Sequence, residues 1–294
     1  MPSINACASL GFAAFPLETA LDQIVALGFR EVELTHLGAY CLHLPMETAH
    51  PQDLVDVVNR FGLKTRAMNV STSRMVNGSI QRVVLSDRSQ TKGIIAYTTW
   101  YLQLARLLGA QCVSFPISPR VLDAGSWKET ADVSARVFRE IVAVGADLGV
   151  KVNLEVPHLF QLTDTIDHTM YLFDHINHTN LGATVDSSHW GIIGYDLDRL
   201  FSLLGDRLVN IHLRDSRGTD TLDFKQELEL TPGTGQVDFV TFGSTLDRIG
   251  YQGNVTLELE HRHGRLADCI EEFHRGLSYL EICGWKVPKR MTDY

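Results

Sequence analysis

Short apolar runs alternate with amphipathic segments along the whole chain. Apolar runs of this kind are typical of strands buried in a parallel sheet, and the longer amphipathic segments are typical of helices that cover it. Gly149 follows one such segment in the position that favours a left-handed helix cap. The pattern predicts strands at 4–12, 31–34, 63–70, 111–115, 151–155, 182–186, 208–213 and 254–259, and helices at 16–27, 51–61, 94–108, 129–148, 165–176, 197–204, 237–249 and 266–282.

This strand–helix rhythm predicts the fold class. Repeated βα units with no low-complexity linker between them indicate an α/β protein, a (β/α)8 TIM barrel in which residues 1–294 form a single domain. A length of 294 residues suits one such barrel. A doubly wound open sheet is the alternative.

Four of the expected strands carry, at their last residue or the one before it, a side chain that can bind a metal ion: Glu155, Asp186, His212 and Glu258. A barrel brings the carboxyl ends of its strands to one face, where its active site lies. Taken singly, each residue has an ordinary interpretation as a solvated, ion-paired or packed side chain. Four in succession at equivalent positions favour a divalent-metal site.

The chemistry of these side chains narrows the choice of metal. Carboxylates with one imidazole suit Mn²⁺, Mg²⁺ or Co²⁺ better than structural zinc, for which thiolates would be expected. We expect Mn²⁺, with Mg²⁺ or Co²⁺ as alternatives. The five cysteines are scattered and form no CxxC pair, which indicates reduced thiols in a cytoplasmic protein.

Further polar and aromatic residues follow the expected ligands. His158, His189 and Trp190 follow closely after two of the strand ends. The Trp190 ring either forms the floor of a binding site or packs against neighbouring side chains. Asp215 is either a partner of the ligands or a cap for its own loop. Arg217 is either a clamp for a substrate oxygen or a solvated charge.

The motifs of the C-terminal half resemble a known family. The chain is similar to the xylose-isomerase-like TIM-barrel superfamily, and within it to the sugar-phosphate isomerase/epimerase group that includes the D-tagatose and D-psicose 3-epimerases. The N-terminal half matches in its rhythm alone. The matching segments are 154–155, 185–189, 211–215, 232–239 and 250–258.

The resemblance implies roles for individual residues. In that group a Glu, an Asp, a His and a second Glu bind the metal, and they match the four strand-end residues. The two glutamates, here Glu155 and Glu258, also act as acid and base on opposite faces of the substrate. The residues that contact substrate oxygens match His189 and Arg217.

Two positions set this chain apart from that pattern. The epimerases carry another Glu soon after the first ligand, where this chain has His158 and Gln161, so we expect a different sugar contact. Glu260 lies two residues past Glu258 and on the same strand face. Glu258 matches the family register and is the expected ligand.

Proton transfer next to a carbonyl is the chemistry that suits this set. A hydrogen beside a carbonyl becomes acidic when a divalent cation stabilises the developing enediolate, and two carboxyl groups can then remove and return the proton. The expected activity is that of a metal-dependent sugar isomerase or epimerase similar to the ketose 3-epimerases. The alternative is a lyase resembling the inosose or 3-dehydroshikimate dehydratases.

Two further alternatives belong to other classes. A repair nuclease resembling endonuclease IV would need a larger histidine cluster and a basic surface, whereas the net charge is -9. A non-catalytic sugar-binding protein would have no reason to keep four ligands. The expected partner is therefore a small carbohydrate or polyol-derived molecule, with no nucleic acid and no membrane, in a homo-oligomer by resemblance.

Overall fold

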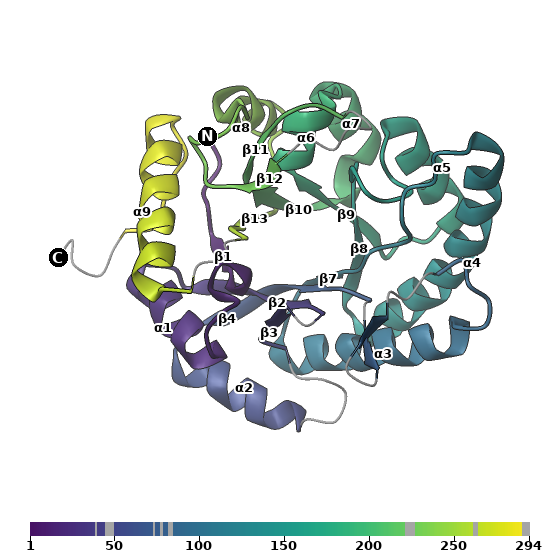
Figure 1. The fold of residues 1–294 in the computed structure, drawn as a ribbon, viewed down its shortest axis with the longest axis horizontal. Coiled ribbons are helices and arrows are strands. Elements are labelled where there is room, and N and C mark those ends of the chain that lie inside the picture. Colours follow the sequence, from purple (N-terminus) through teal and green to yellow (C-terminus); the bar gives the residue numbers. More distant parts are fainter. Residues whose placement is uncertain are drawn as a thin grey trace.

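Parallel strands close into a ring at the centre of the molecule (Figure 1). The computed structural model describes residues 1–38, 40–44, 50–72, 74–76, 79–81, 85–220, 227–260 and 264–289. Pairing of β1 with both β13 and β2 closes the ring and excludes the open sheet. Within the described residues, the barrel strands are β1 (Ala6–Ala8), β2 (Glu31–Leu37), β4 (Lys64–Val70), β7 (Cys112–Ser114), β8 (Lys151–Glu155), β9 (Leu181–Asp186), β10 (Leu208–Leu213) and β13 (Asn254–Leu257).

Helices surround this ring and connect its strands, as the sequence pattern predicts. They are α1 (Leu17–Ala26), α2 (Pro51–Arg60), α3 (Thr91–Leu108), α4 (Ala124–Leu148), α5 (Ile166–Ile176), α6 (Ser187–Ile193), α7 (Leu197–Leu204), α8 (Phe239–Arg248) and α9 (Leu266–Ile282). Gly149 ends α4 with φ +70°, in the predicted left-handed cap. Among the helices of the described residues, none has the length and apolar character needed to cross a membrane.

Short antiparallel strand pairs lie outside the eight-stranded barrel. β3 (Cys41–Leu42) extends β2 antiparallel, and β5 (Arg74–Val76) pairs with β6 (Ser79–Gln81). β11 (Asp215–Arg217) follows β10 closely and pairs antiparallel with β12 (Glu227–Leu230).

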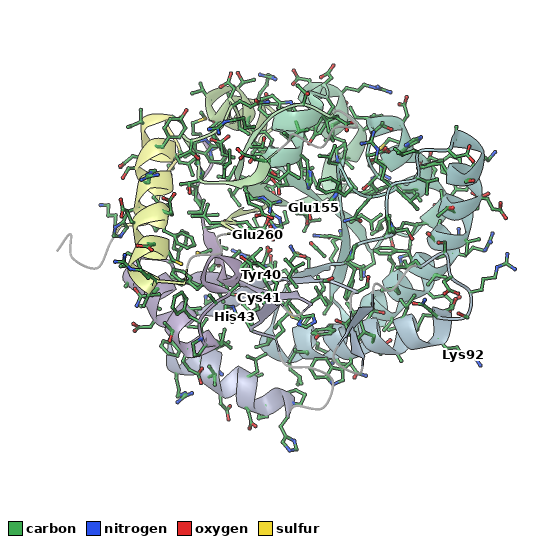
Figure 2. The ribbon with its side chains drawn as sticks, viewed as in Figure 1. Tyr40, Cys41, His43, Lys92, Glu155 and Glu260 are labelled. Atoms are coloured by element: carbon green, nitrogen blue, oxygen red, sulfur yellow. The ribbon has the colours of Figure 1, made fainter. Side chains whose placement is uncertain are left out.

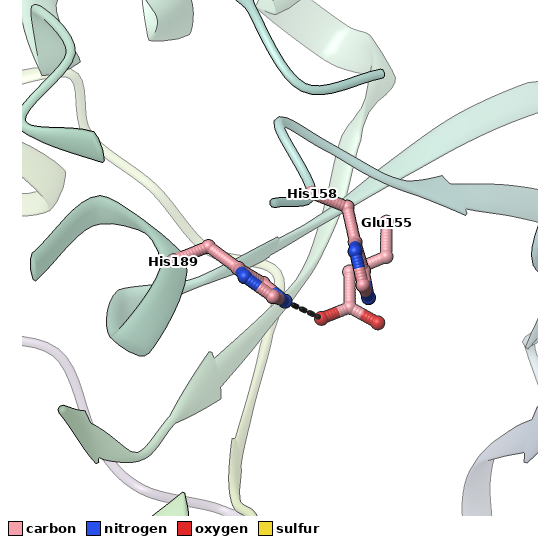
Figure 3. A group of neighbouring side chains, drawn as sticks. All are labelled: Glu155, His158 and His189. Carbon is pink, nitrogen blue, oxygen red and sulfur yellow. Dashed lines mark ion pairs between the residues drawn. The ribbon is translucent and has the colours of Figure 1, made fainter. Parts of the chain in front are cut away.

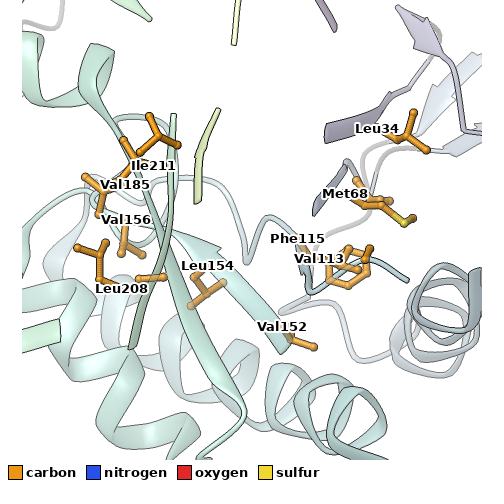
Figure 4. Close-up of a cluster of buried hydrophobic side chains, with 14 of the residues drawn as sticks. Leu34, Met68, Val113, Phe115, Val152, Leu154, Val156, Val185, Leu208 and Ile211 are labelled. Atoms are coloured by element: carbon orange, nitrogen blue, oxygen red, sulfur yellow. The ribbon is translucent and has the colours of Figure 1, made fainter. Parts of the chain in front are cut away.

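The barrel strands place apolar and polar side chains on opposite faces. Successive residues of a strand alternate in direction, so one face of β8 carries Val152 and Leu154 and the other carries Asn153 and Glu155. Val152 and Leu154 are fully buried in the same hydrophobic cluster as helix residues such as Phe138 (Figure 4). The polar set points into the barrel, where Asn153 Nδ2 donates to the Thr184 hydroxyl of β9 (3.2 Å).

The structure corrects the expected first strand. The pattern predicts one strand over 4–12, but β1 spans only Ala6–Ala8 and a short 3₁₀ helix, Ser9–Phe12, follows it. The Ser9 hydroxyl accepts a hydrogen bond from the Thr35 backbone (3.1 Å), and Phe12 stacks on Phe273 of α9 (4.8 Å). Because every residue of both elements is buried, the hydrophobic pattern does not mark the point where the strand ends.

Candidate active site

The four predicted metal ligands lie at the carboxyl ends of neighbouring barrel strands. Asp186 ends β9 and pairs in register with His212 of β10. Glu258 follows the last residue of β13, and its backbone N–H donates to the carbonyl of Leu213 (3.1 Å). Glu155 ends β8 and points into the ring (Figure 2). The barrel therefore gathers side chains that are far apart in the sequence.

Two overlapping clusters in the described residues have the spacing of metal ligands. One ligand atom each from Glu155, Asp186 and His212 lie within 4.8 Å of one another, and so do atoms of Glu33, His212 and Glu258. His212 Nδ1 and Glu155 Oε1 are buried and make no hydrogen bond of good geometry, although Glu258 Oε2 lies 3.1 Å from the first and His189 Nε2 lies 3.4 Å from the second. Buried polar atoms are normally satisfied, so this donor set of carboxylate oxygens and one imidazole fits a divalent cation.

Glu33 of β2 is a site residue that the sequence analysis missed. Its side chain is fully buried, with Oε1 2.9 Å from Nε2 of His212. Asn210 Nδ2 donates to the other carboxylate oxygen (3.0 Å). The signal was a Glu that alternates with the buried Val32 and Leu34 of β2 and so faces the barrel interior, where a charged residue is rarely buried without a partner. Glu33 is placed to hold the orientation of His212.

Neighbouring charges of opposite sign shift the pKa values of His212 and Glu258. Burial alone would lower the pKa of His212, but the carboxylates of Glu258 and Glu33 raise that pKa well above its ordinary value. Burial would likewise raise the pKa of Glu258, but His212 and Arg214 lower it to about 2. Without a metal ion, the histidine is therefore a cation held between two carboxylates.

Arg214 is the second residue that the sequence analysis did not assign. Its buried guanidinium lies 2.5 Å from Asp186 Oδ2 and 2.7 Å from Glu260 Oε2, and 3.8 Å from Glu258 Oε2. Arg214 stands two residues after His212 and so shares its inward-facing side, which was the available signal. A positive charge therefore sits against two of the predicted metal ligands.

The contacts described below for Arg217 and Trp190 are with residues other than the predicted metal ligands. Arg217 belongs to β11, is largely exposed and pairs with Glu227 of β12 (3.2 Å). Trp190 lies on α6, donates its indole N–H to the Tyr195 carbonyl (3.0 Å) and packs against Phe242. Their predicted substrate contacts stay predictions.

His158 and His189 lie together beside Glu155 (Figure 3). Their ring centroids are 4.0 Å apart, and His189 Nε2 is 3.4 Å from Glu155 Oε1. His189 lies on α6, a helix that the sequence pattern did not predict. Asp186 caps the N-terminus of this helix, because its carboxylate accepts a hydrogen bond from the backbone N–H of Ser188 (2.7 Å). Burial, with the charges of His189 and Arg214, lowers the pKa of His158 well below its ordinary value. His158 is therefore neutral at physiological pH.

A cavity of about 220 Å³ opens above these residues. Sites for drug-sized ligands are usually larger, at roughly 300–1,000 Å³, so this cavity suits a small polar molecule. Glu258 and Glu260 both line it, but only Glu258 belongs to a cluster with His212. The lining residues that carry charge or can hydrogen-bond are Thr35, Asn69, Ser71, Ser114, Glu155, His158, Gln161, Arg214, Glu258 and Glu260.

Asp215 caps its own loop, one of the two interpretations left open by the sequence. Its carboxylate accepts the backbone N–H groups of Gly233 (2.9 Å), Gly235 (2.8 Å) and Val237 (3.0 Å). A Cβ atom on Gly235 would lie 2.3 Å from Asp215 Oδ1, so the loop needs glycine there. The segment 232–239 is therefore held against β11.

Proteins of known activity resemble parts of this chain. The chain is 26% identical over 133 residues to an inosose isomerase of Bacillus subtilis, covering 45% of this chain and 48% of the relative. It is 32% identical over 116 residues to a ketose 3-epimerase of Arthrobacter globiformis, covering 38% and 36%. The chain thus spans about half the length, or less, of these curated relatives.

Solved structures share the whole fold. A 3-keto-D-glucoside 4-epimerase from Escherichia coli superposes with a TM-score of 0.73 at 16% identity, covering 96% of this chain and all of that one. A D-allulose 3-epimerase from Methylomonas gives 0.71 at 15% identity, covering 96% and 98%. The family model described as xylose isomerase-like TIM barrel matches residues 21–282. The chain therefore belongs to the xylose isomerase-like TIM-barrel family.

Proposed function

We propose that this protein is a divalent-metal-dependent sugar isomerase or epimerase, most similar in activity to the ketose 3-epimerases. The observation that carries the proposal is a pair of clusters with the spacing of metal ligands, Glu155 with Asp186 and His212, and His212 with Glu258 and Glu33, beside a small cavity that Glu155 and Glu258 line. The names of the relatives support the same class, since they include inosose isomerases, an L-ribulose 3-epimerase and a ketose 3-epimerase.

The metal ion, which we propose to be Mn²⁺, would be held by Glu155, Asp186, His212 and Glu258. When bound, it supplies positive charge that makes a hydrogen next to a substrate carbonyl more acidic. Nε2 of His212 lies 2.9 Å from Oε1 of Glu33 and 3.0 Å from Nδ2 of Asn210. With the metal bound at Nδ1, the Glu33 carboxylate would accept the proton that stays on Nε2. A carboxylate behind the ligating histidine also raises its basicity.

Glu155 and Glu258 would transfer the proton. They arrive from different strands, β8 and the end of β13, and both line the cavity. One carboxylate takes the hydrogen from the carbon beside the carbonyl, and the other returns a proton to the opposite face, which inverts that carbon. Return to the neighbouring carbon on the same face would instead give an aldose–ketose shift.

Hydrogen–deuterium exchange tests the proposal. The protein would be loaded with Mn²⁺ and incubated in D₂O with D-allulose, D-tagatose or an inosose. The sugar would then be separated from the paramagnetic ion and its ¹H NMR spectrum recorded. We expect deuterium at the carbon next to the carbonyl and the appearance of an epimer. Exchange followed by loss of water would favour the dehydratase alternative. No exchange with any of these ketoses, despite bound metal, would contradict the proposed activity.

Replacing Glu33 with Gln should weaken metal binding. The amide cannot accept the His212 proton with a full negative charge, and losing such a partner typically costs about 10–100-fold in metal affinity. Calorimetric titration with Mn²⁺ measures this. The matched control is Glu31→Gln, two residues earlier on β2, whose carboxylate pairs with Arg66 (2.8 Å) and not with the site. Equal affinities in both variants would remove Glu33 from the metal site.

The homo-oligomer and the cytoplasmic location expected from the resemblance and the cysteines stay predictions. Light scattering of the purified protein measures the first, and a monomer at micromolar concentration would contradict it.

A further inference from the structure

Glu260 lines the cavity but has no place among the groups that could hold the metal ion. It follows β13 closely, and Figure 2 shows it toward the centre of the ring with Glu155. Three clusters of described residues have the spacing of metal ligands, the third being Glu155 with His158 and His189, and Glu260 belongs to none of the three. Its carboxylate is therefore placed to meet the molecule that fills the cavity.

Arg214 fixes the position of this carboxylate. Its Nη1 lies 2.7 Å from Glu260 Oε2, and its Nη2 lies 2.5 Å from Asp186 Oδ2. The side chains of Arg214 and Glu260 are only 8% and 13% exposed, so water and salt screen the pair weakly. A carboxylate has about four acceptor positions, and one ion pair does not occupy them all. Glu260 can therefore keep its contact with Arg214 and also accept a hydrogen bond from a ligand.

Negative charge is in excess around the cavity. Among the described residues that line it, Arg214 is the one lysine or arginine, and it faces the carboxylates of Glu155, Glu258 and Glu260. Both terminal nitrogens of Arg214 already contact carboxylates, so its charge is largely neutralised before a ligand enters. A divalent ion would be offset by its own ligands, and Glu260 adds a further negative charge. Like charges repel strongly at a partly buried site, which disfavours an anionic ligand.

We propose that Glu260, held by Arg214, is a specificity residue that selects an uncharged polyhydroxy substrate and rejects sugar phosphates and sugar acids. This inference rests on the proposed function and narrows its substrate class. The Glu260 carboxylate accepts a hydrogen bond from a substrate hydroxyl and repels a phosphate or carboxylate group at the same place. Uncharged groups that suit further hydroxyls also line the cavity: Thr35, Asn69, Ser71, Ser114 and Gln161. The 3-dehydroshikimate dehydratase alternative, whose substrate is an anion, is disfavoured.

Inorganic phosphate tests the charge of the cavity without a sugar. The protein would be saturated with Mn²⁺ and freed of excess ion, and the bound Mn²⁺ would be counted. Phosphate binding would then be followed through the relaxation of water protons by the bound ion. Glu260→Gln removes the charge at constant size, and we expect it to bind phosphate at least about tenfold more tightly than the unaltered protein. Glu260→Asp, which keeps the charge, and the matched control Glu31→Gln should not differ from the unaltered protein.

Two results of this titration have different meanings. Equal phosphate affinity in Glu260→Gln and the unaltered protein, including no measurable binding to either, would overturn the inference. A protein that binds no Mn²⁺ would contradict the proposed function, and with it the inference that rests on it.

Sugars test the hydroxyl contact. D-Tagatose and D-tagatose 6-phosphate differ in charge only at the end of the sugar away from the carbonyl. If D-tagatose is a substrate, we expect Glu260→Gln to raise its KM about tenfold with kcat within about threefold, because the contact is lost from ground state and transition state alike. The phosphate ester should inhibit this variant about tenfold more strongly than the unaltered protein. A fall in kcat at unchanged KM, or unchanged inhibition by the ester, would overturn the specificity role. If no ketose reacts, the phosphate titration still decides the inference.

Discussion

Replacing Glu155 or Glu258 with Gln is expected to stop epimerisation, with a loss of about 10²–10⁴-fold or more, the usual contribution of a placed acid or base. If the two carboxylates act on opposite faces, each variant should still exchange deuterium into one epimer, the one whose hydrogen the remaining carboxylate removes. The two variants should differ in which epimer that is. Deuterium incorporation into each purified epimer, followed by NMR, measures both effects.

Both glutamates are also predicted ligands, so Mn²⁺ must be shown to be bound in each variant. Glu31→Gln is again the control, since Glu31 begins β2 at the other end of the barrel from the cavity and pairs with Arg66. Epimerisation that persists in either active-site variant would contradict the assignment of the acid–base pair. Exchange into the same epimer in both variants would place the two carboxylates on one face.

Arg214→Met is expected to destabilise the metal-free protein and to tighten metal binding. Arg214 is 7% exposed, and its guanidinium lies against Asp186 and Glu260. Removing one partner of a buried ion pair typically costs about 3–5 kcal/mol of unfolding free energy, because the remaining charges stay buried without compensation. A divalent ion would then meet less repulsion, since unit charges about 4 Å apart interact by about 4 kcal/mol at an effective dielectric of about 20. We expect Mn²⁺ affinity to rise about tenfold or more.

Urea unfolding with and without Mn²⁺, together with calorimetric titration, measures both effects. Arg66→Met is the matched control: it also breaks an arginine–glutamate pair inside the barrel, but away from the predicted ligands. Mn²⁺ should add more stability to Arg214→Met than to the control or the unaltered protein. Unchanged metal affinity in Arg214→Met would show that the guanidinium does not compete with the ion.

The barrel and its strand ends could be predicted from the sequence because each rests on a local pattern. The apolar run before Glu155 marks β8, and the same holds for Asp186 on β9 and His212 on β10. The fold then places the ends of parallel strands together. The family resemblance is confirmed by the match over residues 21–282.

The contacts between those strand ends could not be predicted in the same way. Glu33 contacts His212 across the barrel interior, although the two residues are far apart in the sequence. The neighbouring hydrogen bond from Asn210 to Glu33 likewise spans 177 positions, and no local pattern links residues so distant. The contacts of Arg214 with Asp186 and Glu260 could not be predicted either, because they join the ends of different strands. The backbone N–H groups of Phe160 and Leu159 donate to the rings of His158 and His189, and only the folded loop defines these contacts.

Anomalous diffraction from crystals grown with Mn²⁺ tests the central claim most directly. We predict one strong manganese peak per chain, within about 2.5 Å of carboxylate oxygens of Glu155, Asp186 and Glu258 and of Nδ1 of His212. The rings of His158 and His189 should lie outside the coordination sphere. A peak bound by His158 and His189, or no peak among the four strand-end residues at saturating Mn²⁺, would contradict the account.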